Sequence, residues 1–372
     1  MGDVGIVATR YYNWPGSLRL ESGAYLGPLT IAYETYGELN AAGDNAILVL
    51  HALTGSAHIA GRHSPDDRLP GWWDPLVGPG RALDTRRYFV VCANVLGGCY
   101  GTTGPASINP SSGRPYGKEF PTITIRDMVR AQKILLDYLG VKHLVAAIGG
   151  SMGGMQVLEW GFLYPEMVTA IIPIAVGGRT TPMQIAFNNV QREAIYADPD
   201  WQEGNYYGTP GPQRGLALAR RIGTITYKSD ISWTMKFGRT LVNPERYYQL
   251  EGQFEVESYL AYQGRKLVQR FDANAYIYLT KAMDLYDVSH GRGNYAEVWV
   301  NLPRCLGIGI SSDFLFPPYQ VKEIVRLINA GGGRARYVEL NSPYGHDAFL
   351  IEFKQLETFI KSYLTREIPA NG

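Results

Sequence analysis

The chain has 372 residues, 45% of them hydrophobic and 19% charged, and its 35 Lys+Arg against 34 Asp+Glu leave a formal net charge of +1. This length exceeds that of one average domain. Because the charges balance, the protein has no overall positive potential that would attract nucleic acid or an anionic membrane surface. No apolar run is long enough to span a membrane, and Met1–Arg10 has no signal-peptide pattern, so we expect a cytoplasmic protein.

The first half of the chain alternates strand and helix patterns. Residues 29–36 alternate apolar and polar side chains like an edge strand, whereas residues 45–50 and 88–95 are continuous apolar runs typical of buried strands. A long loop rich in glycine, proline and serine follows. Thr124 then opens a predicted helix with Asp127 at the capping-box position, and Gly140 ends it.

The stretch 145–154 contains the most informative motif. An apolar run stops at Gly149-x-Ser151-x-Gly153, and a helical pattern follows from Met155. Strand, G-x-S-x-G and helix form the nucleophile-elbow pattern, in which a serine on a strained turn presents its hydroxyl outward. The alternative is a glycine-rich loop that packs a helix closely against a sheet. We expect Ser151 to be a catalytic nucleophile.

The order of the remaining elements predicts an α/β-hydrolase fold, with a mostly parallel sheet and helices on both faces. Residues 168–176 form another buried run, and 178–298 change to helical spacing rich in tyrosine, tryptophan and arginine. Strand patterns return at 304–310 and 335–340, with helices at 317–330 and 347–363. We therefore expect a core made of 1–177 and 299–372, with residues 178–298 inserted as a helical lid.

Two residues after the insertion are candidates to complete a triad with the serine. In this fold the chain order is Ser, then Asp or Glu, then His, each after a strand at the carboxyl edge of the sheet. His346 is the only one of six histidines that follows a late strand, and Asp313 comes directly after the strand ending at Ile310. The alternatives are a helix-start histidine and a helix N-cap aspartate. Asp347 is a poorer orienting acid, because neighbours on a helix point about 100 degrees apart.

An oxyanion formed at the serine needs two N–H donors. The loop after the 45–50 strand normally supplies one, and the residue after the nucleophile supplies the other, so Leu53 and Met152 are our candidates. The glycine-rich segment 96–104 lacks the spacing of a phosphate-binding loop, and we interpret it as a wall of the active site.

The three cysteines, Cys92, Cys99 and Cys305, are scattered among apolar neighbours. This pattern is typical of reduced core thiols in a cytosolic protein and favours neither a metal site nor a redox site.

Several motifs together resemble the homoserine O-acetyltransferases of methionine biosynthesis, and the resemblance runs from about residue 12 to residue 361. They are His51-Ala-Leu-Thr-Gly55, Gly71-Trp-Trp-Asp74, Gly78-Pro-Gly80, Asn94-Val-Leu-Gly-Gly-Cys-Tyr-Gly101, Gly104-Pro-Ala-Ser-Ile-Asn109, Gly149-Gly-Ser-Met-Gly-Gly154 and Tyr344-Gly-His-Asp347. The resemblance implies Ser151, Asp313 and His346 as the triad and the Leu53 and Met152 amides as the oxyanion hole. It also implies a helical lid that pairs two subunits.

The resemblance further implies that Arg220 and Asp347 bind the amino-acid substrate. A zwitterion offers a carboxylate to a guanidinium and an ammonium to a carboxylate, which agrees with this pair. Arg221 follows immediately, so Arg221 is an alternative to Arg220 for the contact with the substrate carboxylate. The chain departs from the family pattern at Ser56 and Arg265, where acidic residues are common, and Ser56 leaves the identity of the acyl donor open.

We expect an acyltransferase that moves acetyl from acetyl-CoA, a co-substrate, to the side-chain hydroxyl of L-homoserine through an acyl-serine. We expect no cofactor, no metal, no nucleic acid and no membrane. The alternatives are succinyl as donor, serine as acceptor, a plain serine esterase on the same fold, and a binding protein without catalysis.

Overall fold

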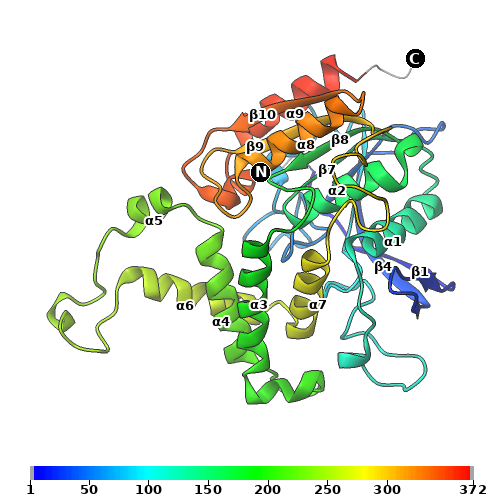
Figure 1. The fold of residues 1–372 in the computed structure, drawn as a ribbon. Coiled ribbons are helices and arrows are strands. Elements are labelled where there is room, and N and C mark those ends of the chain that lie inside the picture. Colours follow the sequence, from blue (N-terminus) through cyan, green and yellow to red (C-terminus); the bar gives the residue numbers. More distant parts are fainter. Residues whose placement is uncertain (1–3, 369–372) are drawn as a thin grey trace.

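An eight-stranded sheet organises the fold (Figure 1). The computed structural model describes residues 4–368, so the outermost residues of the two predicted core segments, 1–3 and 369–372, lie outside it. In spatial order the strands are β1 (Arg10–Trp14), β4 (Leu29–Tyr36), β6 (Phe89–Ala93), β5 (Ala46–Leu50), β7 (Leu144–Gly150), β8 (Val168–Ile174), β9 (Arg304–Ile310) and β10 (Ala335–Leu340). A separate hairpin pairs β2 (Leu18–Arg19) with β3 (Tyr25–Leu26).

The sheet is mostly parallel, as the sequence predicts. β4 pairs antiparallel with both β1 and β6, and every pairing from β6 through β10 is parallel. β5 and β6 are buried along their whole length, which explains why their sequences are unbroken apolar runs.

One prediction about the sheet is wrong. β4 is not the edge strand, because β1 covers its outer side. The alternation of apolar and polar residues in β4 suggests a strand with one solvent-exposed face, yet its charged residue Glu34 is only 1% exposed. β1 was missed because its sequence is polar and aromatic, as suits an exposed edge.

Helices cover both faces of the sheet. α1 (Ile125–Tyr138), α2 (Met152–Leu163) and α8 (Pro318–Ala330) pack on the face that carries Leu48 and Val91. α9 (Phe353–Arg366) packs on the opposite face with Ile47 and Val90, beside the loop that contains the short helix η1 (Asp74–Leu76). The two sets of strand residues alternate, as the two-residue period of a strand requires. The predicted capping box is present at Thr124 and Asp127.

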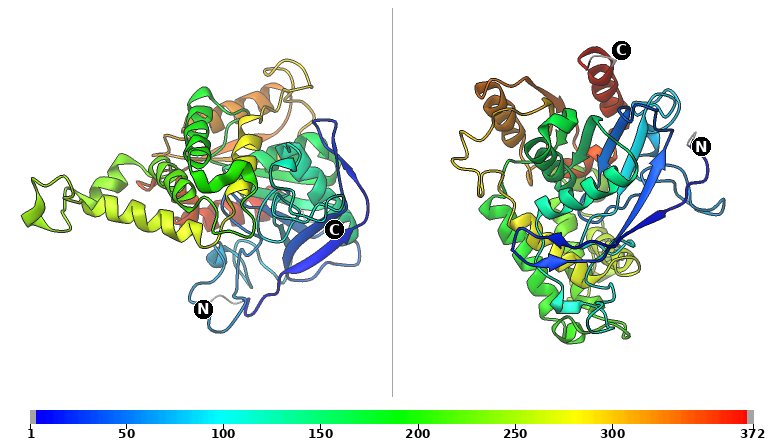
Figure 2. Two further views of the ribbon diagram at one scale, coloured as in Figure 1. Left: turned by 90° about the horizontal axis from the view of Figure 1, so that it is seen from below. Right: turned by 90° about the vertical axis from the view of Figure 1, so that its right-hand side faces the viewer.

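The segment between β8 and β9 is helical. It contains α3 (Pro182–Tyr196), η4 (Pro199–Gly204), α4 (Gln213–Thr226), α5 (Asp230–Phe237), η5 (Pro244–Arg246), α6 (Glu255–Val268) and α7 (Ala273–Asp284). Figures 1 and 2 show α3, α4 and α7 beside the sheet, while α5 and α6 extend away from it as an arm. Within residues 4–368, no helix combines the length and the apolar character that crossing a membrane requires.

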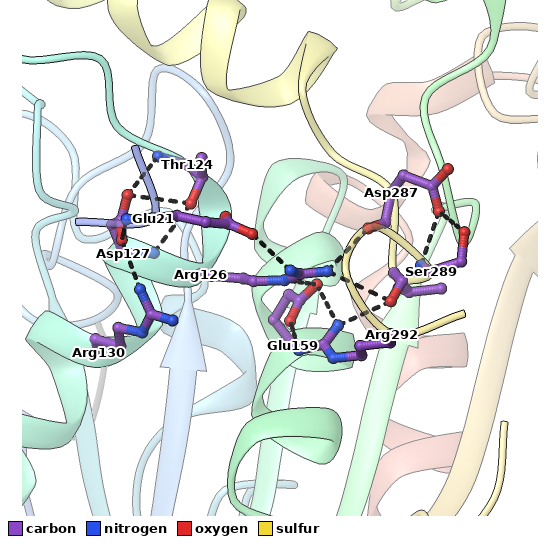
Figure 3. Close-up of polar contacts among 10 residues, drawn as sticks. Glu21, Thr124, Arg126, Asp127, Arg130, Glu159, Asp287, Ser289 and Arg292 are labelled. Carbon is purple, nitrogen blue, oxygen red and sulfur yellow. Dashed lines mark hydrogen bonds and ion pairs between the residues drawn. The ribbon is translucent and has the colours of Figure 1, made fainter. Parts of the chain in front are cut away.

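A buried ionic network ties the end of this helical segment to the sheet's helices (Figure 3). Glu159 of α2 accepts from Arg126 Nε of α1 at 3.2 Å and from Arg292 Nη2 at 2.6 Å. Arg126 also pairs with Glu21 and donates to the backbone carbonyl of Asp287 at 3.1 Å. The carboxylates and guanidiniums balance, so the charges are compensated where they are buried.

The chain after β10 differs from the single helix predicted over 347–363. A 3₁₀ turn, η6 (Gly345–Leu350), comes first, and α9 begins only at Phe353. The break keeps His346 and Asp347 on a turn at the end of the sheet instead of on a regular helix. The helix after the elbow also starts three residues earlier than predicted, at Met152. The remaining short 3₁₀ helices are η2 (Gly117–Glu119) and η3 (Pro165–Met167).

Candidate active site

Ser151 stands between the end of β7 and the start of α2, with φ 58° and ψ −125°. A non-glycine residue in this region is strained, so the surrounding structure must hold it there. The turn passes so close to β5 that a Cβ on Gly153 would lie 2.1 Å from the carbonyl oxygen of Leu50, and one on Gly149 would lie 2.5 Å from it. The two motif glycines are therefore required by close packing, and the strained serine between them has the geometry of a nucleophile elbow.

Asp313 and His346 meet at the carboxyl ends of β9 and β10. His346 Nδ1 lies 2.6 Å from Asp313 Oδ2, and the side chains are 4% and 0% exposed, respectively. Asp313 Oδ1 accepts from the backbone N–H groups of Leu315 and Phe316, each at 2.9 Å, which fixes the carboxylate. Asp313 does not cap α8, because Pro317 occupies the N-cap position. Asp313 is thus placed to hold the imidazole with Nδ1 protonated.

His346 Nε2 is buried and has no hydrogen-bond partner among residues 4–368. Ser151 and His346 line the same cavity, and the structure records no hydrogen bond between Ser151 Oγ and Nε2. Catalytic hydrogen bonds are often long without substrate and shorten in the complex. Burial lowers the pKa of His346, but the charge and hydrogen bond of Asp313 more than offset this and raise it above 6.5.

The N–H groups of Leu53 and Met152 belong to the two segments next to Ser151. Met152 is the first residue of α2, so no preceding helical turn accepts its N–H. The Leu53 loop is fixed by His51, whose Nε2 accepts from Val95 N–H at 3.1 Å while Nδ1 lies 2.8 Å from the carbonyl of Ala52. Burial lowers the pKa of His51 to about 4, so this imidazole is neutral.

Gln156 connects the two segments that carry these N–H groups. Its Nε2 donates to the carbonyls of His51 and Met152, at 3.3 and 3.1 Å. Residues 96–104 do not line the cavity, so their predicted role as a wall is wrong. They lie behind the Leu53 loop, where the carbonyl of Tyr100 accepts from the Asn94 amide.

The cavity is mainly apolar but carries one side chain of each charge, Arg220 from α4 and Asp347 from η6. Arg220 Nη1 lies 3.4 Å from Thr54 Oγ1, and its guanidinium lies over the ring of Tyr227 at 5.4 Å. Arg221 instead lines a separate surface groove together with Arg265. Arg220 is therefore the arginine of the pair that faces Ser151.

One set of cavity residues and one neighbour of a cavity residue were not predicted from the sequence. Gln184, Asn188 and Gln191 of α3 line the cavity. Their amide side chains recur at helical spacing, so the sequence does contain a pattern that indicates one polar helix face. Lys228 Nζ lies 3.3 Å from Asp347 Oδ2, a contact between residues 119 positions apart that no local pattern indicates. Ser56 is not among the cavity residues, and its carbonyl accepts from Trp72 Nε1 at 2.9 Å.

Comparison with known proteins agrees with this geometry. The family described as alpha/beta hydrolase fold matches residues 45–353. A homoserine O-acetyltransferase of Moorella thermoacetica is 80% identical over 99% of this chain and 99% of its own length. One from Carboxydothermus hydrogenoformans is 58% identical over 98% of this chain and 96% of its own. The chain belongs to the homoserine O-acetyltransferase family.

The solved structures that are similar to this chain include esterases as well as homoserine O-acetyltransferases. The crystal structure of homoserine O-acetyltransferase from Bacillus anthracis matches with a TM-score of 0.92 at 31% identity, over 98% of this chain and 99% of that one. Esterase E22 matches with a TM-score of 0.90 at 30% identity, over 96% of this chain and all of that one. The resemblance inferred from the sequence motifs is confirmed, as is the α/β-hydrolase fold.

Proposed function

We propose that the protein transfers an acetyl group from acetyl-CoA to the side-chain hydroxyl of L-homoserine. The observation that carries this proposal is a single cavity that joins Ser151, the His346 and Asp313 pair, and two opposite charges, Arg220 and Asp347. A nucleophile with a base supports acyl transfer, and the charge pair suits a zwitterionic amino acid.

In the first half-reaction His346 Nε2 takes the proton of Ser151, and Oγ attacks the thioester carbonyl. The N–H groups of Leu53 and Met152 stabilise the resulting oxyanion. The carbon–sulfur bond then breaks, His346 returns the proton to the departing CoA thiolate, and an acyl-serine remains. In the second half-reaction His346 removes the proton of the homoserine hydroxyl, whose oxygen attacks the acyl-serine. The bond between the acyl carbon and Ser151 Oγ then breaks, and His346 returns the proton to Oγ.

Acetyl is the proposed donor group because the cavity offers no second cation. Arg220 is the only Lys or Arg among the described residues that line it. A succinyl group would bring a carboxylate that competes with the amino acid for Arg220. Homoserine is preferred over serine on the family relationship, since one methylene changes pocket binding by only about 1 to 3 kcal/mol.

The second candidate is an esterase, favoured by the similarity to esterase E22. The two functions differ in whether homoserine or water accepts the acyl group. Thiol release from acetyl-CoA should depend on homoserine, with O-acetylhomoserine as product. Release that proceeds equally without homoserine would reject the transferase proposal. Parallel assays with succinyl-CoA and with serine separate the remaining alternatives.

We also propose that residues 178–298 act as a lid on a core of 1–177 and 299–372, and that the arm formed by α5 and α6 pairs two subunits. The arm and the turn between its helices expose large apolar side chains, including Met235, Tyr248 and Leu250, the last of these fully. Solvent-exposed apolar clusters of this kind are typical of interaction surfaces. The proposed compartment is the cytoplasm, without nucleic acid or membrane as partner.

A further inference from the structure

A second cluster of functional side chains lies away from the serine, where β4 meets the loop that follows β5. Glu34 comes from β4, and His58 and His63 come from the loop. His63 Nε2 lies 2.7 Å from Glu34 Oε1, and His58 Nδ1 lies 3.0 Å from Glu34 Oε2. The two imidazole rings are 3.9 Å apart between centroids. None of the three residues lines the cavity that contains Ser151.

Glu34 is a buried charge at this cluster. The Glu34 side chain is 1% exposed, and His58, His63 and Tyr36 contact its carboxylate. Among residues 4–368, no Lys or Arg forms an ion pair with it. A buried carboxylate beside two imidazoles and no Lys or Arg suits a metal ligand, because buried charges are normally paired or bound to a metal.

The three side chains offer converging donor atoms. One nitrogen from each histidine and a carboxylate oxygen lie within 4.8 Å of one another. Thr9 Oγ1 donates to Oε1 at 2.9 Å and Tyr36 donates to Oε2 at 2.7 Å, so both carboxylate oxygens are oriented by outer partners. Oriented carboxylates of this kind are typical of metal ligands, and two imidazoles with one carboxylate suit late first-row divalent ions.

The cluster is also accessible. The side chain of His63 is 48% exposed while that of Glu34 is 1% exposed, which leaves an approach from solvent through the histidine. We propose that Glu34, His58 and His63 form a binding site for a divalent ion of the Zn²⁺ class, with water completing its coordination.

Such an ion would act as a clamp and not in the acyl transfer. Tyr36 Oη accepts from the backbone N–H of Ile59 at 3.1 Å, so the Glu34 network already holds this loop against β4. The loop starts at the segment that carries Leu53, and an ion bound to His58 and His63 would fasten it to the sheet at two further points.

The test uses the full chain freed of metal by a chelator. Titration with Co²⁺, followed by visible absorption, should give protein-dependent ligand-field bands that saturate at one ion per chain, and Zn²⁺ should displace them. Zn²⁺ should also raise the Tm. The His63→Asn variant should bind at least about tenfold more weakly and lose most of the Tm increment. His63 is half exposed, so the variant is expected to fold; its Tm in chelator checks this.

The matched control is His290→Asn, which removes an exposed histidine from the loop between α7 and β9 and should leave binding unchanged. Equal Co²⁺ binding by the parent protein and His63→Asn would overturn the proposal, as would the absence of any protein-dependent bands. Glu34→Gln should also weaken Co²⁺ binding; if that variant fails to fold, the comparison of His63→Asn with His290→Asn still decides. Thiol release is read separately, so failure here leaves the acyltransferase proposal untouched.

Discussion

Lys228 forms an ion pair with Asp347, one of the residues that line the catalytic cavity, with Nζ 3.3 Å from Oδ2. If Asp347 binds the ammonium of homoserine, that ammonium must compete with Lys228 for the same carboxylate. We predict that Lys228→Met lowers KM for homoserine several-fold, because it removes both a competitor and a like charge. Asp347→Asn should raise KM instead. Steady-state kinetics with varied homoserine measure both, and an increased KM in Lys228→Met would show that the lysine contributes to binding.

The roles of Arg220 and Arg221 can be separated by substitution. Arg220→Met should raise KM for homoserine about tenfold to a hundredfold, since a charge-assisted hydrogen bond contributes about 1.5 to 3 kcal/mol. Arg221→Met is the matched control and should have little effect, because Arg221 lines a different groove. Acyl-enzyme formation without homoserine should be unchanged in both variants. Equal losses in the two variants would contradict the assignment of Arg220.

The strained backbone at Ser151 predicts a difference between two inactive variants. Ser151→Ala and Ser151→Gly should both lose acyl-enzyme formation. Ser151→Gly should unfold with a free energy about 1 to 2 kcal/mol higher than Ser151→Ala, because glycine adopts φ 58° and ψ −125° at little cost. Denaturant unfolding of both proteins measures this. Equal stability would mean that the turn stores no strain.

The pH dependence of acyl-enzyme formation should follow His346. The base must be neutral to accept a proton, so activity is lost as pH falls through its pKa, which Asp313 raises above 6.5. The acid limb of kcat/KM for acetyl-CoA should therefore have its midpoint above pH 6.5. Asp313→Asn should move that midpoint lower and reduce kcat by about 10⁴-fold, as the same change does in a serine-protease triad. A midpoint that Asp313→Asn does not move would assign the limb to another group.

The network in Figure 3 predicts a stability effect without a catalytic one. Glu159→Gln should destabilise the fold by about 3 to 5 kcal/mol, because it leaves two guanidiniums, Arg126 and Arg292, with Glu21 as their only carboxylate partner among residues 4–368. Glu166→Gln changes an exposed residue of η3, the short helix after α2, and is the control; it should change stability by less than about 0.5 kcal/mol. The folded Glu159→Gln protein should keep its KM values.

The sequence was sufficient for features that depend on local pattern. The glycines around Ser151 are required because a Cβ on Gly153 or Gly149 would lie 2.1 or 2.5 Å from the Leu50 carbonyl oxygen, and such a requirement is visible as a motif. Features made by distant residues were missed. The position of Glu34 in its strand suggests a solvent-facing side chain. The histidines that contact its buried carboxylate come 24 and 29 residues later, so no local pattern indicates them. The break before α9 was missed because the apolar pattern continues across it.

The supports of the two oxyanion donors have a kinetic consequence. His51, with its pKa near 4, and the Gln156 amide hold the Leu53 loop and the start of α2 without any group that changes charge near neutral pH. The dipoles around the developing negative oxygen therefore stay constant while the medium is titrated. A plot of log kcat/KM for acetyl-CoA against pH should accordingly have unit slope on its acid side, as expected when only one group titrates.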